Sequence, residues 1–572
     1  MGNVADYIIE SLEKAGVSRI YGIVGDSLNA FSSALQKRKS IEWVHTRHEE
    51  VAAFAAGAEA QLTEKLSVCA GSCGPGNMHL INGLYDCHRS HAPVLAIAAD
   101  IPSSEIGSGY FQETNPKALF ADCTVFCERL VSVSQLPHLL HNAMQAAIGE
   151  KGVAVLIISG DMAMTKMPNT KAEPFLWPLH RQLTPDIHGL QTIAEKLNAS
   201  PKVAIFAGHG ARHANRELVS LAHKLQAPII HTLRGKPYVE PNNPFDVGMT
   251  GLIGFSSGYH AMETCDTLLL LGTSFPYRQF YPEKAHIIQI DHRGGQLGKR
   301  CRVDYSVVGD VRDSIDALLP LVQQRQDVLF LQKCTSHYQK SRKDLDLLAT
   351  FDKSNIIHPQ YLTHLIDRYA DEDALFTCDV GTPTVWAARY LSMNGKRNLF
   401  GSFNHGSMAN AMAQAIGLQK AAPNRQVIAL CGDGGFSMLM GDILTLHQYQ
   451  LPIKLIVFNN STLGFVEMEM RVSGMLEYGT SLTNPNFAEV AKAVGIKSIH
   501  VDEANQLESA IQHALSTEGP FLVDVKVNRN ELVMPPTVTA EEVKGFGLFM
   551  LRAIINGKGT EVVDIIKQNL MR

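Results

Sequence analysis

The residues most suggestive of chemistry form a glycine-rich turn with one acid, Gly432-Asp433-Gly434-Gly435, followed later by the pair Asn459-Asn460. A carboxylate oxygen and an amide oxygen are ligands that Mg²⁺ accepts, together with phosphate oxygens and water. Glycines let the backbone approach phosphates closely, and a helix N-terminus favours an anion. The pattern predicts a magnesium–diphosphate site in which Asp433, Asn460 and a main-chain carbonyl at Thr462 bind the metal.

Three segments around this turn have sequence patterns typical of the strands and the helix that would position it. Val427–Leu430 and Lys454–Phe458 are apolar runs typical of buried parallel strands, and Phe436–Gln448 between them is typical of a helix. Ligands of open parallel sheets bind where the strands end, and Asp433 and Asn460 both follow strand ends. An ordinary glycine-rich turn is the alternative, and the asparagine pair after the second strand argues against it.

A second candidate group is an acid at the start of an alanine-rich helix. Glu42–Thr46 predicts a strand, His48-Glu49-Glu50 follows it, and Val51–Leu62 predicts the helix. A carboxyl group at such a junction can point into an interface between domains. From the spacing alone, a solvated carboxylate at the helix start is the favoured explanation.

Together these motifs resemble those of the thiamine-diphosphate enzyme family, whose diphosphate motif begins with GDG and ends with NN. The resemblance selects Glu49 over Glu50 as the acid that protonates the cofactor's aminopyrimidine ring. It also identifies Met408, in Gly406-Ser407-Met408, as the apolar wedge that holds the cofactor in a bent shape. Core filling is the alternative role for this methionine.

The resemblance further implies which residues surround the cofactor and its reacting carbon. Phe111 and Gln112 would border that carbon from a loop on the substrate side, and Phe465 would lie beside it and toward a flavin. The implied thiamine diphosphate-binding residues are Glu49, Gly406, Ser407, Met408, Asp433, Gly434, Gly435, Asn460, Ser461, Thr462, Leu463, Gly464, Phe465 and Val466.

The middle of the chain carries weaker signals for a nucleotide cofactor. The strand-like run Val203–Ala207 ends in a GxG turn, and Ile287–Ile290 ends in an acid that could bind ribose or adenosine hydroxyl groups. Gly248–Gly254 resembles the flavin-contacting stretch of family members that bind FAD, although related decarboxylases keep this domain without flavin. The predicted FAD-binding residues are Gly208, Gly210, Gly251, Leu252, Ile253, Gly254, Thr273, Ser274, Phe275, Pro276, Tyr277, Arg278, Asp291 and Asp310.

Strand-like and helical segments alternate along almost the whole chain, which is typical of parallel α/β domains. A chain of 572 residues is too long for one hydrophobic core. We expect three parallel-sheet α/β domains and a tail: an aminopyrimidine-binding domain at 1–180, an FAD-binding domain at 181–340, a diphosphate-binding domain at 341–530, and an amphipathic C-terminal segment at 531–572.

The C-terminal segment has two apolar helical faces. The first is formed by Phe546, Phe549, Met550, Ala553 and Ile554, and the second by Val562, Val563, Ile566 and Leu570. From Lys544 onward there are five Lys or Arg residues and two acids, within a chain of net charge −5. An anionic membrane surface and the protein's own body both fit as the surface that these faces cover.

Composition excludes several other classes of protein. The net charge of −5 gives no reason to expect nucleic acid as a partner. The ten cysteines include no CxxC pair, so buried free thiols explain them better than a metal site. No apolar run is long enough to span a membrane, and the start of the chain lacks the apolar core of a signal peptide. We therefore expect a cytoplasmic protein whose membrane contact is peripheral.

Over its whole length the chain resembles the quinone-linked pyruvate oxidases of this family. That resemblance implies oxidative decarboxylation of pyruvate to acetate and CO₂, with electrons passing through FAD to ubiquinone. It also implies a homotetramer with the thiamine diphosphate between two copies, and an anionic-lipid contact through the tail on the cytoplasmic face of the inner membrane. The alternatives are an acetolactate synthase-like carboligase with a non-redox FAD, a phosphate-using oxidase and a membrane-associated scaffold. The roles of His79, His88 and Glu469 stay open.

Overall fold

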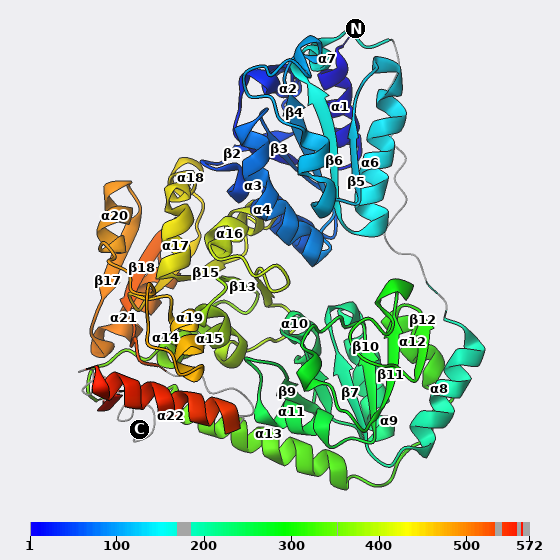
Figure 1. Ribbon diagram of the computed structural model, residues 1–572, viewed down its shortest axis with the longest axis vertical. Helices are drawn as coiled ribbons and strands as arrows, with labels where there is room; N and C mark the ends of the chain where they lie inside the picture. Colours follow the sequence, from blue (N-terminus) through cyan, green and yellow to red (C-terminus); the bar gives the residue numbers. More distant parts are fainter. Residues whose placement is uncertain are drawn as a thin grey trace.

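The computed structural model describes residues 2–168, 183, 185–351, 353–531, 540–556, 562, 563 and 565. Three parallel α/β domains lie at the corners of a triangle in Figure 1, and one long helix, α13 (Leu329–Leu348), runs from the second domain to the third. The predicted fold class of three parallel-sheet domains is confirmed. The predicted boundary at residue 180 lies outside the described residues.

The first domain contains a six-stranded parallel sheet in the order β2-β1-β3-β4-β6-β5. Its strands are β1 (Arg19–Gly22), β2 (Glu42–His45), β3 (Ser67–Gly71), β4 (Val94–Asp100), β5 (Phe126–Arg129) and β6 (Val153–Ser159). Its helices are α1 (Val4–Lys14), α2 (Asn29–Arg38), α3 (Glu49–Thr63), α4 (Pro75–Ser90), α5 (Pro116–Leu119), α6 (Leu136–Glu150) and α7 (Gly160–Met164). Strands β4 and β6 are buried throughout, as continuous apolar runs in a sheet covered on both faces should be.

The second domain has its own parallel sheet, in the order β12-β11-β10-β7-β8-β9. Its strands are β7 (Val203–Ala207), β8 (Ile229–His231), β9 (Asp246–Met249), β10 (Thr267–Leu271), β11 (His286–Asp291) and β12 (Tyr305–Val308). Its helices are α8 (Ile187–Ala199), α9 (Asn215–Leu225), α10 (Lys236–Val239), α11 (Ser256–Glu263) and α12 (Val311–Leu318). The strand order reverses between β7 and β10, which is where open sheets of this kind bind ligands.

The third domain repeats the plan with the order β14-β13-β15-β16-β18-β17. Its strands are β13 (Leu375–Cys378), β14 (Asn398–Phe400), β15 (Val427–Gly432), β16 (Lys454–Asn459), β17 (Lys497–Val501) and β18 (Phe521–Lys526). Its helices are α14 (Pro359–Tyr369), α15 (Thr382–Tyr390), α16 (Asn410–Ala421), α17 (Asp433–Leu439), α18 (Ile443–Tyr449), α19 (Gly464–Val472), α20 (Phe487–Ala493) and α21 (Ala504–Ser516).

The helix expected at Phe436–Gln448 differs from the structure in a way that tertiary contacts explain. It begins earlier, at Asp433, and a short 3-10 turn divides it into α17 and α18. At that turn the carboxylate of Asp442 accepts a hydrogen bond of 2.8 Å from the backbone N–H of Arg47 in the first domain. The break therefore provides a buried polar contact between two domains, which helical periodicity cannot reveal.

The first and third domains meet along α3 and α16. Nearly the whole of α3 from Val51 to Ala60 is buried, because its alanines pack against neighbouring helices on more than one side. At the crossing, a Cβ atom on Gly417 would overlap the carbonyl oxygen of Ala55. The close approach of the two helices therefore depends on the absence of a side chain at position 417.

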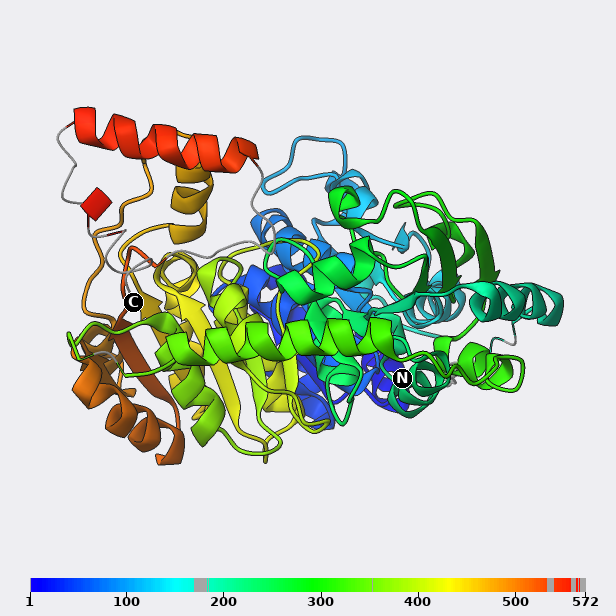
Figure 2. The same cartoon turned by 90° about the horizontal axis from the view of Figure 1, so that it is seen from below.

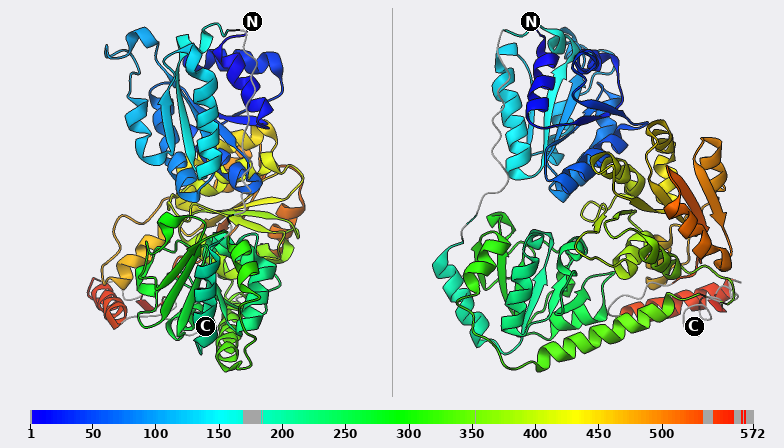
Figure 3. Two further views of the ribbon diagram at one scale, coloured as in Figure 1. Left: turned by 90° about the vertical axis from the view of Figure 1, so that its right-hand side faces the viewer. Right: turned by 180° about the vertical axis from the view of Figure 1, so that it is seen from behind.

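The helix at the C-terminal end of the chain, α22 (Ala540–Ile555), lies across α19 (Figure 2), and Figure 3 shows it in red from two further sides. Phe549 and Ala553 are fully buried, and Phe546 and Met550 pack beside them. Ile554 is 56% exposed and therefore does not belong to the buried face. Docking on the protein's own body thus accounts for most of the predicted first face, while Ile566 and Leu570 lie outside the described residues. Among the described helices, none is both long and apolar enough to cross a membrane.

We expect Gly417→Ala to destabilise the contact between the first and third domains. The added methyl group must push α16 away from α3, at a cost of about 1–3 kcal/mol for overpacking. Urea unfolding of the purified protein measures this change. Gly441→Ala is the matched control, because no atom lies within 4 Å of a Cβ at that position. An equal loss of stability in both variants would contradict the expectation.

Candidate functional site

Asp433 is the acid of the glycine-rich turn, and the structure places it at the carboxyl end of β15 as the first residue of α17. Only 2% of the residue is exposed. Its Oδ1 accepts the N–H of Gly434 at 2.9 Å, and its Oδ2 accepts the N–H of Ser461 at 2.7 Å. Burial raises the pKa of Asp433 to about 6. A nearby divalent cation would reverse that effect, so this carboxylate fits a metal ligand.

Strands β15 and β16 are neighbours, so the predicted metal-binding residues emerge at one edge of the sheet. Ser461 reaches Asp433 directly, and Oδ1 of Asn460 accepts the N–H of Thr462 at 3.1 Å. Thr462 also forms an isolated bridge with Ser481. The segment from Asn460 to Thr462 therefore lies beside Asp433, and the binding of one cation by Asp433, Asn460 and Thr462 stays a prediction.

Two polar side chains that the sequence did not single out complete this region. The amide Nδ2 of Asn484 donates to Oδ2 of Asp433 at 2.7 Å and to Oδ1 of Asn459 at 2.9 Å. Asp379, which is 1% exposed, accepts the N–H groups of Ala411 at 2.9 Å and Gly432 at 3.2 Å. Burial raises the pKa of Asp379 to about 7. Its only sequence signal was its position directly after β13.

The glycines of the turn lack side chains, and other residues occupy the space that a side chain would take. A Cβ on Gly435 would lie 2.5 Å from Oδ2 of Asp379, and a Cβ on Gly434 would lie 3.3 Å from Cε of Met408. The side chain of Met408 therefore lies beside the turn. Asp379 joins the backbone of the turn to the segment that carries this methionine. The predicted wedge and the predicted diphosphate site are parts of one cluster.

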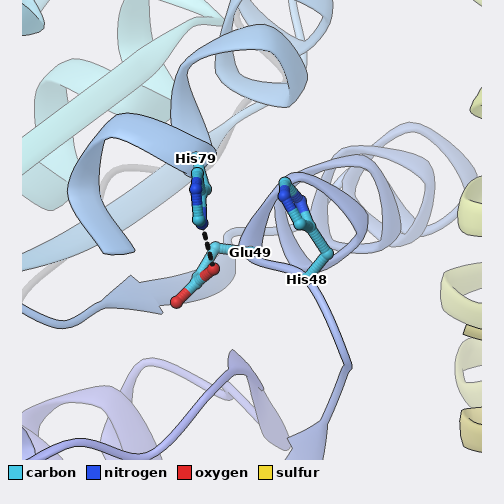
Figure 4. Close-up of side chains that lie close together, drawn as sticks. All are labelled: His48, Glu49 and His79. Carbon is cyan, nitrogen blue, oxygen red and sulfur yellow. Dashed lines mark hydrogen bonds and ion pairs between the residues drawn. The ribbon is translucent and has the colours of Figure 1, made fainter. Parts of the chain in front are cut away.

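Glu49 begins α3 and is almost fully buried in the first domain. Nδ1 of His79 lies 3.0 Å from Oε2 of Glu49, and the rings of His48 and His79 stack with their centroids 4.4 Å apart (Figure 4). The polar atoms of these three residues lie within 4.8 Å of one another. Imidazole lone pairs lie in the ring plane, so two stacked rings direct them side by side rather than at one ion. The arrangement is better suited to orienting Glu49 than to binding a metal.

A cavity of about 610 Å³ lies where the three domains meet. Its lining includes most of the predicted flavin residues, namely Gly210, Gly251, Leu252, Ile253, Thr273, Ser274, Phe275, Pro276, Tyr277 and Asp291. It also includes residues predicted to bind thiamine diphosphate, namely Gly406, Met408, Phe465 and Val466, together with Glu469. The structure therefore brings segments from distant parts of the sequence to one cavity.

Other predicted residues lie elsewhere. Asp310 lines a neighbouring cavity of about 1740 Å³, as His88 does, and its carboxylate caps α12 by accepting the N–H of Arg312. Gly208, Gly254 and Arg278 line neither cavity. Glu49 is also absent from the lining of both cavities. The assignment of these residues to a cofactor stays a prediction.

The cavity where the three domains meet contains positive charges that no motif revealed. Lys151, Arg212, Arg234 and Arg293 all line it. Burial is the main cause that lowers the pKa of Lys151 to about 8 and that of Arg234 to about 10, and neighbouring guanidinium groups add to the effect. Arg212 also binds both carboxylate oxygens of Glu64, at 2.8 and 3.2 Å, across the boundary between the first two domains. A cavity lined in this way suits a phosphate-containing ligand.

Three protein-family models match the chain in order. They describe the thiamine pyrophosphate enzyme N-terminal TPP binding domain at residues 2–119, its central domain at 190–318 and its C-terminal TPP binding domain at 379–525. The predicted thiamine diphosphate-binding domains are confirmed by these matches.

Curated relatives extend over nearly the whole chain. The putative thiamine pyrophosphate-containing protein YdaP of Bacillus subtilis is 40% identical, with 98% of each chain covered. The pyruvate oxidase of Lactiplantibacillus plantarum is 30% identical, with 91% of this chain and 88% of the relative covered. The acetolactate synthase isozyme 2 large subunit of Escherichia coli is 29% identical, with 93% and 97% covered.

Asn484→Ala should weaken Mg²⁺-dependent binding of thiamine diphosphate by about 10- to 100-fold. The change removes the amide that orients Asp433, and the loss of such outer partners has effects of that size. Titration of the metal-free protein with Mg²⁺ at a fixed cofactor concentration measures the change. Asn394→Ala, at an exposed asparagine that binds the carbonyl of Glu372, should leave the affinity unchanged. Equal affinities in the wild type and Asn484→Ala would exclude this role.

Glu64→Gln should destabilise the protein by about 1–2 kcal/mol at pH 7, with the difference shrinking in acid. Hydrogen bonds from His213 and Arg212 hold the pKa of Glu64 well below its usual range. The ionised carboxylate therefore adds stability above its unfolded pKa of 4.5. That stability is lost as the pH falls from there toward the folded pKa. Unfolding of both proteins between pH 7 and pH 3 checks this, and a difference that stays constant would refute it.

Proposed function

This chain belongs to the thiamine pyrophosphate enzyme family, and on that premise we propose that it is a pyruvate oxidase that passes electrons through FAD to a quinone. The overall reaction converts pyruvate and water to acetate and CO₂, and releases two electrons and two protons to the acceptor. Ubiquinone is the proposed acceptor. The pyruvate oxidase relative supports the substrate, since it is related over nine-tenths of this chain.

One observation carries the redox part of the proposal. Met408 and Phe465 line the same cavity as residues 251–253 and the segment at 273–277. If a flavin binds those two segments, its ring lies next to the residues that surround the reacting carbon. Direct transfer of electrons between two cofactors needs such proximity, whereas a carboligase does not.

The protein's own groups have distinct roles in this proposal. Bound thiamine diphosphate supplies a nucleophilic carbon and an electron sink, and bound FAD supplies the two-electron acceptor. Glu49 holds a proton on the aminopyrimidine ring, with its carboxylate oriented by His79. Gln112 binds the substrate, and Phe111 and Phe465 exclude water from the reacting atoms. Asp433, Asn460 and Thr462 would hold the Mg²⁺ that binds with the cofactor.

The separation of Glu49 from the cavity supports an oligomer. Glu49 lies in the first domain and lines neither of the two cavities, whereas Met408 and Phe465 line the cavity where the three domains meet. Phe111 is 78% exposed and Met78 is 52% exposed, so apolar surface surrounds the loop on the substrate side. We propose that a second copy covers this surface and that each site combines the first domain of one copy with the third domain of the other. A homotetramer would contain two such pairs.

The outward face of α22 supports contact with a membrane. Leu551, Ile554 and Ile555 are between 55% and 73% exposed while the opposite face of the helix is docked. The excess of basic residues after position 544 would attract anionic lipid. The protein would then act at the cytoplasmic face of the inner membrane, where a lipid-soluble quinone is accessible.

Anaerobic mixing with pyruvate tests the reaction. With thiamine diphosphate and Mg²⁺ present, pyruvate should bleach the absorbance of the bound flavin, acetate should form, and added ubiquinone should restore the absorbance. Glu49→Gln should slow the bleaching by a factor of at least about 100, because the general acid is lost. Accumulation of acetolactate with the flavin still oxidised would replace the oxidase by a synthase.

The membrane contact is tested separately with vesicles of anionic phospholipid. Quinone reduction by the wild type should rise when vesicles are added, and Leu551→Asp should abolish that rise while flavin bleaching by pyruvate stays unchanged. Leu329→Asp is the matched control, since Leu329 is 73% exposed on α13 and lies in a different helix. Equal stimulation of both variants would exclude the outward face of α22 as the lipid contact.

A further inference from the structure

Gln112 has an unusual backbone conformation for a residue with a side chain. Its φ angle is 62°, in the left-handed region, and Gly74 opposite it has a φ of 64°. A Cβ atom on Gly74 would lie 2.9 Å from both the Cβ and the carbonyl oxygen of Gln112. The loop around Gln112 therefore packs directly on the backbone of the loop between β3 and α4. This contact fixes the position of the Cβ atom of Gln112.

The other side of the same loop is held by Glu113. Its carboxylate accepts the backbone N–H groups of Gly107 at 2.5 Å, Gly109 at 2.6 Å and Tyr110 at 3.1 Å. These bonds lower the pKa of Glu113. Gln112 is thus held between two fixed segments, and only the torsions of its own side chain remain to be set.

Cys73 contacts the end of the Gln112 side chain. Its thiol Sγ lies 3.3 Å from Oε1 of Gln112 and donates to it. The backbone N–H of Cys73 donates to the hydroxyl of Ser27 at 3.1 Å, and that hydroxyl lies 2.9 Å from the hydroxyl of Ser72. Cys73 is 5% exposed. The thiol therefore occupies a fixed position at one end of the Gln112 amide.

We propose that Cys73 is a positioning residue that determines which end of the Gln112 amide faces the substrate. The two ends differ in chemistry, because the oxygen only accepts hydrogen bonds and the nitrogen only donates them. A thiol that donates to Oε1 leaves the two N–H groups of Nε2 for the opposite side. The carboxylate of a 2-keto acid needs such donors, and an inverted amide would present an oxygen to it instead. The inference rests on the proposed placement of Gln112 beside the substrate.

Kinetics of pyruvate consumption by the holoenzyme test this role whichever product is formed. Cys73→Ala removes the donor and should raise the KM for pyruvate about 3- to 10-fold with kcat nearly unchanged, the size expected from one hydrogen bond. Cys73→Ser keeps a donor and should restore the KM. Cys69→Ala is the matched control, because Cys69 is a buried thiol on β3 that is not bonded to Gln112. A general structural defect would instead lower kcat and cofactor affinity together.

Two further comparisons make the outcome decisive. In a Gln112→Ala background, Cys73→Ala should have no further effect on KM, because the positioning acts only through the amide. The S–H stretching band of Cys73, assigned by its absence in Cys73→Ser, should shift to higher frequency in Gln112→Ala. If the wild type does not consume pyruvate, the proposed function fails. The S–H band then tests by itself whether the thiol of Cys73 donates a hydrogen bond to the amide of Gln112. An unshifted band, an unchanged KM in Cys73→Ala, no rescue by serine, or an equal KM effect in both backgrounds overturns the proposal.

Discussion

The buried carboxylate of Asp433 is the constraint on which the rest of the third domain depends. A charge that is 2% exposed must be matched by donors or by a cation. The donors come from the N–H of Gly434, the N–H of Ser461 beyond the next strand, and the amide of Asn484. These partners converge only because β15 and β16 are adjacent and parallel. The sheet order, the glycine turn and the residues after the asparagine pair therefore together supply the partners that this one buried carboxylate needs.

A second buried acid links this site to the cavity between the domains. Asp379 binds the backbone on both sides of the cluster, at Gly432 and at Ala411. The segment that contains Met408 is thereby fixed relative to the diphosphate turn. Because Met408 also lines the cavity at the three-domain junction, the same segment contacts both the predicted metal site and the wall of that cavity. The close crossing of α3 over Gly417 places the first domain against the same region.

The helix α22 has apolar residues on two faces, of which one is buried against the protein and the other is exposed. Its inner face buries Phe549, whose ring lies 5.5 Å from the guanidinium group of Arg471 on α19. Its outer face leaves Leu551 and Ile555 in solvent. An exposed apolar stripe is unfavourable in water unless it has a partner. The docked helix thus keeps apolar surface available for another contact while the remaining apolar residues stabilise the fold.

The sequence by itself determined the parallel α/β class and most of the central strands. It also indicated the side chains whose type and spacing are typical of a metal–diphosphate site. Asp433 and Asn460 were predicted in this way because each follows a recognisable strand, whereas Glu49 was selected only by the family resemblance of its motif. The tertiary structure alone decided the roles of Asn484, Asp379 and Arg212, since each acts on a partner distant in sequence and belongs to no local pattern. It alone decided which side of α22 is buried, because helical periodicity defines an apolar face but not the surface that covers it. Periodicity reports on neighbours along one element, whereas burial and hydrogen bonding between elements depend on how the domains pack.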